Sequence, residues 1–86
     1  MSKKKKLLNR LLEIPSDFTW GELIAVLKLL GYQQVASGIT GGSRRRFVNL
    51  EGKVILIHEP HPRRIVKKYV LRLVIEKCKE EIKNHE

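Results

Sequence analysis

The sequence contains a single cysteine, Cys78, in 86 residues. The chain therefore cannot form an internal disulfide. Proteins that work in a reducing cytoplasm typically lack disulfides. No stretch comes near the ~20 consecutive apolar residues that a membrane-spanning helix needs. A lysine run near the start precedes two leucines, but Asn9, Arg10 and Glu13 interrupt the apolar run that a secretory leader requires. We therefore expect a cytoplasmic protein.

Acidic residues are scarce, since 9 Asp and Glu stand against 18 Lys and Arg and leave a net charge of +9. This excess predicts a polyanionic partner, with nucleic acid first, an anionic membrane second and an acidic protein third. Hydrophobic residues make up 42% of the chain, which is too many for a disordered polymer. A chain of this size buries only ~60–65% of its unfolded surface, so we expect one domain, 1–86, with a core of two layers.

Two amphipathic segments open the chain. Residues 3–14 carry a leucine stripe at helical spacing and predict a short added helix, whose lysines are either an arm on phosphate or a solvated terminus. Residues 16–31 predict the second helix, because Thr19 and Glu22 have the spacing of a capping box. Trp20 lies on the apolar stripe of this helix, which favours a core residue over a platform for base stacking.

Three short segments, 32–37, 44–50 and 53–58, then predict strands. A glycine-rich loop, 38–42, separates the first two, and an acidic residue followed by glycine predicts a tight hairpin between the last two. The third strand is apolar at four consecutive positions. Either both of its faces are covered, or its outer face awaits a partner.

The last helix is expected to follow a stiff proline-containing connector, 59–62, to begin at Arg63 or Arg64, and to run to about residue 83. The resulting order, α-α-β-β-β-α, predicts an α+β fold with a three-stranded antiparallel sheet packed on helices. The apolar face of the last helix is wider than one sheet needs, which is a second indication of an interface. Its main members are Val66, Tyr69, Val70, Leu73, Val74, Cys78 and Ile82, and Leu71 and Ile75 widen it.

A glycine turn and the start of the second strand form a candidate phosphate cradle. If Phe47 points toward the helices, strand alternation turns Arg45 the same way and the arginines on either side of it outward. Guanidinium groups bind phosphate oxygens bidentately, and the turn amides suit an anion nest. The alternative is a charged edge that repels other strands, but three adjacent arginines favour nucleic-acid contact. The members are Gly42, Ser43, Arg44, Arg45 and Arg46.

Two histidines lie three positions apart around the connector. His58 ends the third strand, and His61 stands between two prolines. Imidazoles beside a basic groove suit the general base and acid of RNA cleavage, in which a 2′-hydroxyl attacks its own phosphate. The alternative is a strand end and an exposed turn residue. Because no acidic or cysteine partner falls at a known ligand spacing, we expect no metal.

Basic residues near the start of the last helix form a second candidate contact. Positions 64, 68 and 72 fall along one edge of a helix. This edge is either a ridge that follows phosphates or a solvated face. Lys67 lies next to this edge and is included in the candidate contact. The members of this contact are Arg64, Lys67, Lys68 and Arg72.

Two motifs resemble the HicA toxin family: Gly-Gly-Ser-Arg-Arg-Arg-Phe at 41–47 and His-Glu-Pro-His-Pro at 58–62. The similarity extends from about Phe18 to about Glu80. Members of that family are small bacterial mRNA interferases with a double-stranded-RNA-binding-like fold, paired with HicB antitoxins. The resemblance implies an mRNA-acting toxin that an acidic HicB-like antitoxin neutralises. We expect no cofactor and no membrane partner.

Arg45 departs from the resembled family, which keeps a catalytic histidine at this position. An arginine cannot shuttle a proton near neutral pH, but it can stabilise a phosphorane transition state. Either His58 or His61 then moves the protons, with Arg45 stabilising charge, or the chain binds RNA without cutting it. The remaining alternatives are a non-catalytic nucleic-acid-binding module and a protein-interaction subunit.

Overall fold

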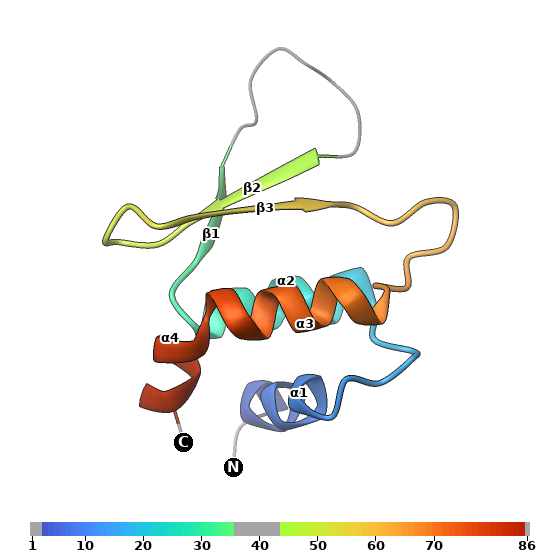
Figure 1. The fold of residues 1–86 in the computed structure, drawn as a ribbon, viewed down its shortest axis with the longest axis horizontal. Coiled ribbons are helices and arrows are strands. Elements are labelled where there is room, and N and C mark those ends of the chain that lie inside the picture. The colour runs from blue at the N-terminus through green and yellow to red at the C-terminus, as the bar shows by residue number, and fades with distance from the viewer. Residues whose placement is uncertain (1–2, 36–43, 86) are drawn as a thin grey trace.

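The computed structural model describes residues 3–35 and 44–85 of the chain (Figure 1). The strands form one antiparallel sheet in the order β1-β2-β3. This confirms the predicted α+β class and the order α-α-β-β-β-α, with the last predicted helix divided in two. The predicted glycine loop, 38–42, lies outside the described residues. The elements are α1 (Lys3–Leu12), α2 (Trp20–Leu29), β1 (Gln33–Val35), β2 (Arg44–Val48), β3 (Val54–His58), α3 (Lys68–Lys77) and α4 (Lys79–Asn84).

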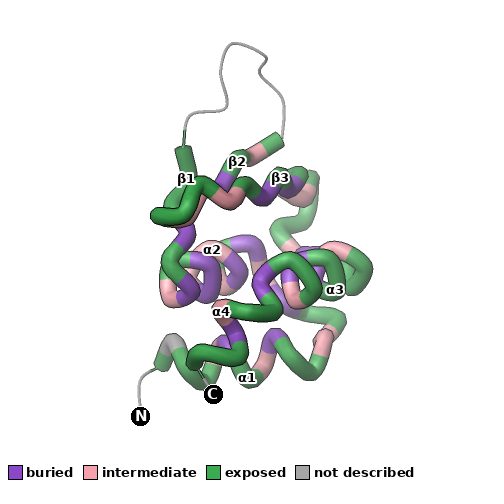
Figure 2. Tube along the Cα trace, turned by 60° about the vertical axis from the view of Figure 1, so that its left-hand side comes forward, coloured by how far each residue is buried: buried purple, intermediate pink, exposed green. Residues whose placement is uncertain are grey.

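The helices cover one side of the sheet in two tiers. Figures 1 and 2 show α2 and α3 directly beneath the strands and α1 on the far side of these two helices. One hydrophobic cluster runs through all tiers, from Leu8 in α1 through Phe47 in β2 to Ile82 in α4. The chain therefore has three layers rather than the expected two, because α1 adds a layer of its own.

The start of α2 confirms the predicted capping box. The Thr19 hydroxyl accepts a hydrogen bond from the Glu22 amide (3.1 Å), and the Glu22 carboxylate accepts one from the Thr19 amide (2.9 Å). The helix begins at Trp20 and not at residue 16, since this cap fixes its first turn. Gly31 follows the helix with φ +94°, a left-handed conformation that glycine adopts without strain. Trp20 is 2% exposed, as expected of a core residue.

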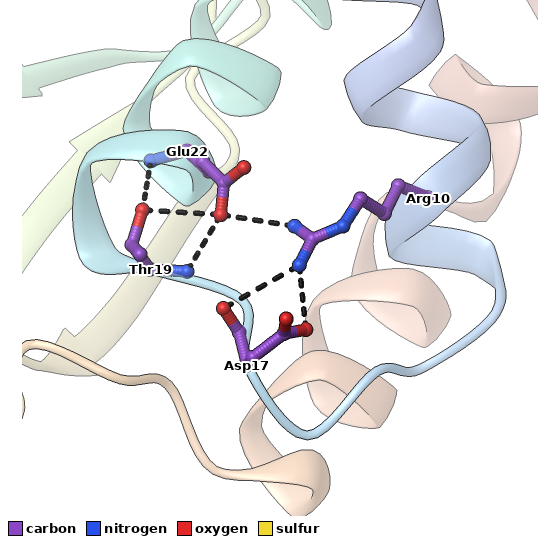
Figure 3. A network of polar contacts seen from close by, with 4 residues as sticks. All are labelled: Arg10, Asp17, Thr19 and Glu22. Atoms are coloured by element: carbon purple, nitrogen blue, oxygen red, sulfur yellow. Dashed lines mark hydrogen bonds and ion pairs between the residues drawn. The ribbon is translucent and has the colours of Figure 1, made fainter.

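Arg10 joins α1 to the start of α2 (Figure 3). Its guanidinium lies 2.5 Å from an Asp17 carboxylate oxygen and 2.9 Å from a Glu22 carboxylate oxygen. The same group lies over the Phe18 ring, 5.2 Å from the ring centroid. Glu22 also belongs to the capping box. Its carboxylate therefore stabilises the start of α2 and, through Arg10, joins α1 to α2.

The last helix begins later than predicted. Arg63 and Arg64 were expected to open it, but α3 begins at Lys68. Ile65 instead forms an antiparallel bridge with Thr19, flanked by two backbone hydrogen bonds of 2.8 Å. Those hydrogen bonds need an extended backbone, so this segment cannot be helical at the same time.

The buried side of α3 also differs from the prediction. Leu71 and Val74 are fully buried, whereas Tyr69 and Leu73, expected on the main apolar face, are 66% and 41% exposed. The helical path breaks at Cys78, whose backbone has φ −102° and ψ 18°, and α4 continues from there. The prediction that Tyr69 and Leu73 belong to the buried apolar face is therefore wrong. These two side chains stay exposed because the sheet does not extend over that side of the helix.

The third strand has one covered face and one bare face. Ile55 and Ile57 point toward the helices and are buried. Val54 and Leu56 point the other way and are 36% and 51% exposed. Among residues 3–35 and 44–85, no side chain covers that outer face enough to bury it, so these residues do not provide the two-sided cover of the first alternative.

Candidate nucleic-acid interface

The outer face of the sheet carries two of the three consecutive arginines. Arg44 and Arg46 are exposed, while Arg45 is half-buried and Phe47 is buried on the helix side. The alternation expected for this strand is therefore confirmed. We call the exposed set formed by Arg44, Arg46 and His58 the arginine face.

Strand register places a histidine beside the arginines. Arg44 lies directly opposite His58 in the β2–β3 pair, and Arg46 lies opposite Leu56. Opposed residues in an antiparallel pair have Cα atoms about 4.5–5.5 Å apart. Side chains of opposed residues also share a face, so the His58 imidazole and the Arg44 guanidinium emerge side by side on the outer surface.

Arg45 lies on the opposite side of its strand and is held by a carboxylate. Its Nε atom is 3.1 Å from a Glu59 carboxylate oxygen, and the second oxygen of Glu59 is 3.2 Å from an Arg64 nitrogen. The Glu59 side chain is only 20% exposed, so this ion pair is less screened than one at a fully open surface. Arg45 is thus fixed by Glu59 rather than extended toward the face that bears Arg44.

Glu59 is a site residue that the sequence reasoning missed. It holds Arg45 from β2 and Arg64 from the segment before α3. The sequence does contain a signal for Glu59, since it is the one carboxylate between His58 and His61 in a strongly basic stretch. Its partners were not readable, since both ion pairs depend on how the chain folds back.

The two histidines border one groove of about 780 Å³ between β3, the connector and α3. His58 enters it from the end of β3 and His61 from the connector, and both are exposed. The described part of the chain holds no cluster of three or more histidine, cysteine, aspartate or glutamate side chains suited to a metal ion.

The second predicted ridge is divided by the fold. Arg64 lies in the extended segment before α3, and Lys67 is the residue that precedes the helix. Lys68 and Arg72 do share a helical edge and are exposed. At ~100° per residue, however, that edge points away from Leu73 and from the groove beside β3.

Two members of the predicted cradle, Gly42 and Ser43, lie outside the described residues. The described part of the site therefore comprises the arginine face, the Glu59 ion pairs and the groove with its two histidines.

No helix among the described residues is long and apolar enough to span a bilayer.

These features define a small basic α+β protein whose sheet presents cations on its open face. A family model described as HicA toxin of bacterial toxin-antitoxin matches residues 20–79. The chain therefore belongs to the HicA toxin family, and the match begins at the first residue of α2. Searches of curated proteins and of solved structures returned no match.

Proposed function

We propose that this chain is a toxin that binds RNA through the arginine face and cleaves it with a histidine. The observation that supports this most directly is the register pairing of His58 with Arg44 on an exposed surface. A guanidinium that binds a phosphate at Arg44 brings the neighbouring ribose within reach of the imidazole. Membership of the HicA toxin family supports the toxin role.

The chemistry needs only groups that this surface carries. An imidazole takes the proton of a ribose 2′-hydroxyl, and the oxygen attacks the adjacent phosphorus. A second imidazole gives a proton to the departing 5′-oxygen, which leaves a 2′,3′-cyclic phosphate and a 5′-hydroxyl. His58 and His61 are the candidates for these two roles. Arg44 and Arg46 stabilise the charge that develops on the phosphorane.

Neutralisation by an acidic, HicB-like antitoxin is the second half of the proposal. A net charge of +9 on a chain this short favours a partner rich in carboxylates. Such a partner competes with RNA for the arginine face.

Cleavage is tested with purified protein and an mRNA transcript. His58→Ala is expected to lower the cleavage rate by about 10²–10⁴-fold, the usual contribution of a general acid or base. His61→Ala is measured in parallel, and His85→Ala, which removes an exposed histidine from the C-terminal end of α4, is the matched control. Undiminished cleavage by both test variants removes the histidines from the mechanism. If clean wild-type protein does not cleave the transcript, the chain is a non-catalytic binding module. The ion pair between Arg45 and Glu59 is an observation that favours this alternative.

Binding is tested separately by RNA titration at several salt concentrations. Arg44→Ala and Arg46→Ala are each expected to weaken binding and to reduce the salt slope by about one, because each removes one phosphate contact. Lys83→Ala removes an exposed cation from α4, on the far side of the molecule from the sheet, and is the control. Equal losses in all three variants would contradict a localised interface.

A further inference from the structure

The helix layer of this fold is wider than its sheet. Adjacent strands lie about 4.8 Å apart, so three strands span roughly 15 Å including their own width. Two packed helices, with axes 8–10 Å apart, span roughly 20 Å. Figure 2 shows β3, one of the two edge strands, above α3, which is the helix on that side. The uncovered side of α3 is where Tyr69 and Leu73 remain exposed.

The backbone of β3 faces this uncovered side. Asn49 donates its amide to the carbonyl of the opposed residue Lys53 (3.1 Å), which makes this a hydrogen-bonded pair. Hydrogen-bonded and non-bonded pairs alternate along an antiparallel ladder. Counting along the register, Val54 and Leu56 belong to non-bonded pairs, so their amides and carbonyls point away from β2.

Within residues 3–35 and 44–85, this edge carries none of the devices that usually protect one. β3 contains no proline, lysine or bulge, and the outward side chains at its start and middle, Val54 and Leu56, are exposed and aliphatic. Natural proteins protect such edges with charge, proline or a covering segment. An unprotected apolar edge is a template for strand addition.

The groove beside this edge has an apolar floor. Ile57, Val70 and Leu73 line it together with Tyr69, Leu56 borders it from the outer face of β3, and its volume is about 780 Å³. A segment lying along β3 would therefore rest on apolar surface from both the strand and the helix.

Positive charge dominates the rim of the groove. Arg63 and Lys67 are exposed, and within the described ranges neither forms an ion pair. The two lining carboxylates are engaged elsewhere, Asp17 by the guanidinium of α1 and Glu59 by its own two arginines. The unmatched rim charge is thus cationic.

We propose that the β3 edge binds an extended segment of a partner protein as a fourth strand, and that this segment alternates apolar with acidic residues. Its backbone pairs with Val54 and Leu56, its apolar side chains pack on Leu73 and Tyr69, and its carboxylates reach the cations of the rim. This inference rests on the antitoxin half of the proposed function and adds a second contact, at the β3 edge next to the arginine face, with a chemistry of its own. RNA is a poor occupant because it offers no apolar side chains, and a second copy brings another +9 of charge.

The test is an NMR titration of the full chain with a synthetic ten-residue peptide that alternates glutamate with valine and isoleucine. The amides of Val54 and Leu56 are expected to shift and to exchange with solvent more slowly as peptide is added. One control peptide replaces every glutamate by lysine, and another replaces every apolar residue by serine. Both are expected to leave these amides unchanged.

Leu73→Glu is the test variant, because it puts a carboxylate on the groove floor at a position exposed enough to tolerate it. It is expected to weaken peptide binding at least about tenfold, as loss of one buried leucine contact requires. Leu50→Glu makes the same chemical change at a fully exposed leucine in the β2–β3 turn and is expected to leave binding unchanged. Equal affinity of the wild type and both variants overturns the proposal.

Other outcomes also decide the matter. Absence of any shift at Val54 and Leu56 with peptide at about 2 mM, a concentration that reveals even millimolar affinity, overturns the proposal. Protection of the same two amides by RNA assigns the edge to RNA instead. Protection that grows with protein concentration alone, with a dimer mass in sedimentation, assigns it to a second copy.

The two proposals fail separately. A double variant, Arg44→Ala with Arg46→Ala, is expected to lose RNA binding and to keep peptide binding. Leu73→Glu is expected to lose peptide binding and to keep RNA binding. A chain that binds the peptide but not RNA refutes the RNA proposal alone. A chain that binds RNA but not the peptide refutes strand addition alone.

Discussion

Arg45 illustrates how the environment of one side chain sets its role. Its neighbours in sequence emerge on the open face, but alternation turns Arg45 inward to Glu59. The ion pair with Glu59 and the second pair of that carboxylate with Arg64 join β2 to the segment before α3. At this position the chain has a structural ion pair, and the proposed proton transfer is left to His58 and His61.

Cys78 is a second residue whose environment decides its chemistry. Burial raises the pKa of the Cys78 thiol to about 11, and the nearby Glu81 carboxylate adds to the shift. The side chain is fully buried at the break between α3 and α4. At pH 8 the thiol is therefore protonated as well as shielded, and both properties suppress its reactivity.

We expect Cys78 in the folded chain to react with an aromatic disulfide reagent at about pH 8 at least ~100-fold more slowly than in denaturant, from thiolate fraction alone. Leu50→Cys places a second thiol at a fully exposed turn position and is expected to add one fast-reacting equivalent. The release of the coloured thiol is followed by absorbance. A native chain that reacts as fast as the introduced turn cysteine would show that the α3–α4 break opens readily.

At the scale of elements, the joint between α1 and α2 concentrates several interactions on Glu22. Burial by itself raises the pKa of this carboxyl group, but hydrogen bonds from the Thr19 amide and hydroxyl and from Arg10 outweigh it and hold the pKa below the ordinary 4.5. A folded-state pKa below the unfolded one stabilises the fold above pH 4.5. That contribution is lost as the pH falls through the folded value.

We expect Glu22→Gln to lower the free energy of unfolding at neutral pH by about 1 kcal/mol, the usual effect of losing a helix cap. The difference between wild type and variant is expected to shrink as the pH falls below 4.5 and the wild-type carboxylate becomes protonated. Urea denaturation across this range measures both. Glu76→Gln, an exposed change on α3, is the control, and a wild-type–variant difference that stays constant with pH contradicts the role of the carboxylate.

Elements specified by adjacent residues were predictable from the sequence. Thr19 and Glu22 specify the start of α2 within one helical turn, and alternation along 44–47 fixes which arginines face outward. The extended backbone around Ile65 was not predictable, because it depends on a bridge to Thr19 far away in the chain. The same holds for Tyr69, whose spacing is that of a core residue and whose exposure follows from where the sheet ends.

At the scale of the whole molecule, the family match and the folded core do not coincide. The match covers 20–79, whereas the core includes Leu8 and Leu11 of α1, which are 2% and 0% exposed. Figure 1 shows α1, the helix that carries these leucines, on the side of the middle helices away from the sheet. The helix before the matched region is therefore a structural layer of this chain.

We expect Leu11→Ala to lower the free energy of unfolding by about 2–5 kcal/mol, as for other fully buried leucines. Leu12→Ala removes the adjacent leucine, which is 36% exposed, and is expected to lower it by less than about 1 kcal/mol. Chemical denaturation of the two variants makes the comparison within one helix. Two equally small effects would mean that α1 contributes little to the core.

The contact between Trp20 and Phe47 has a practical consequence. Trp20 is the single tryptophan of the chain, and its ring meets the Phe47 ring edge-on with 6.0 Å between centroids. The fluorophore therefore sits where α2 meets the underside of the sheet, shielded from water. Its emission shifts to longer wavelength when the core opens, but a ligand on the outer face of β2 leaves it almost unchanged. One fluorescence spectrum thus separates loss of folding from loss of binding in every variant above.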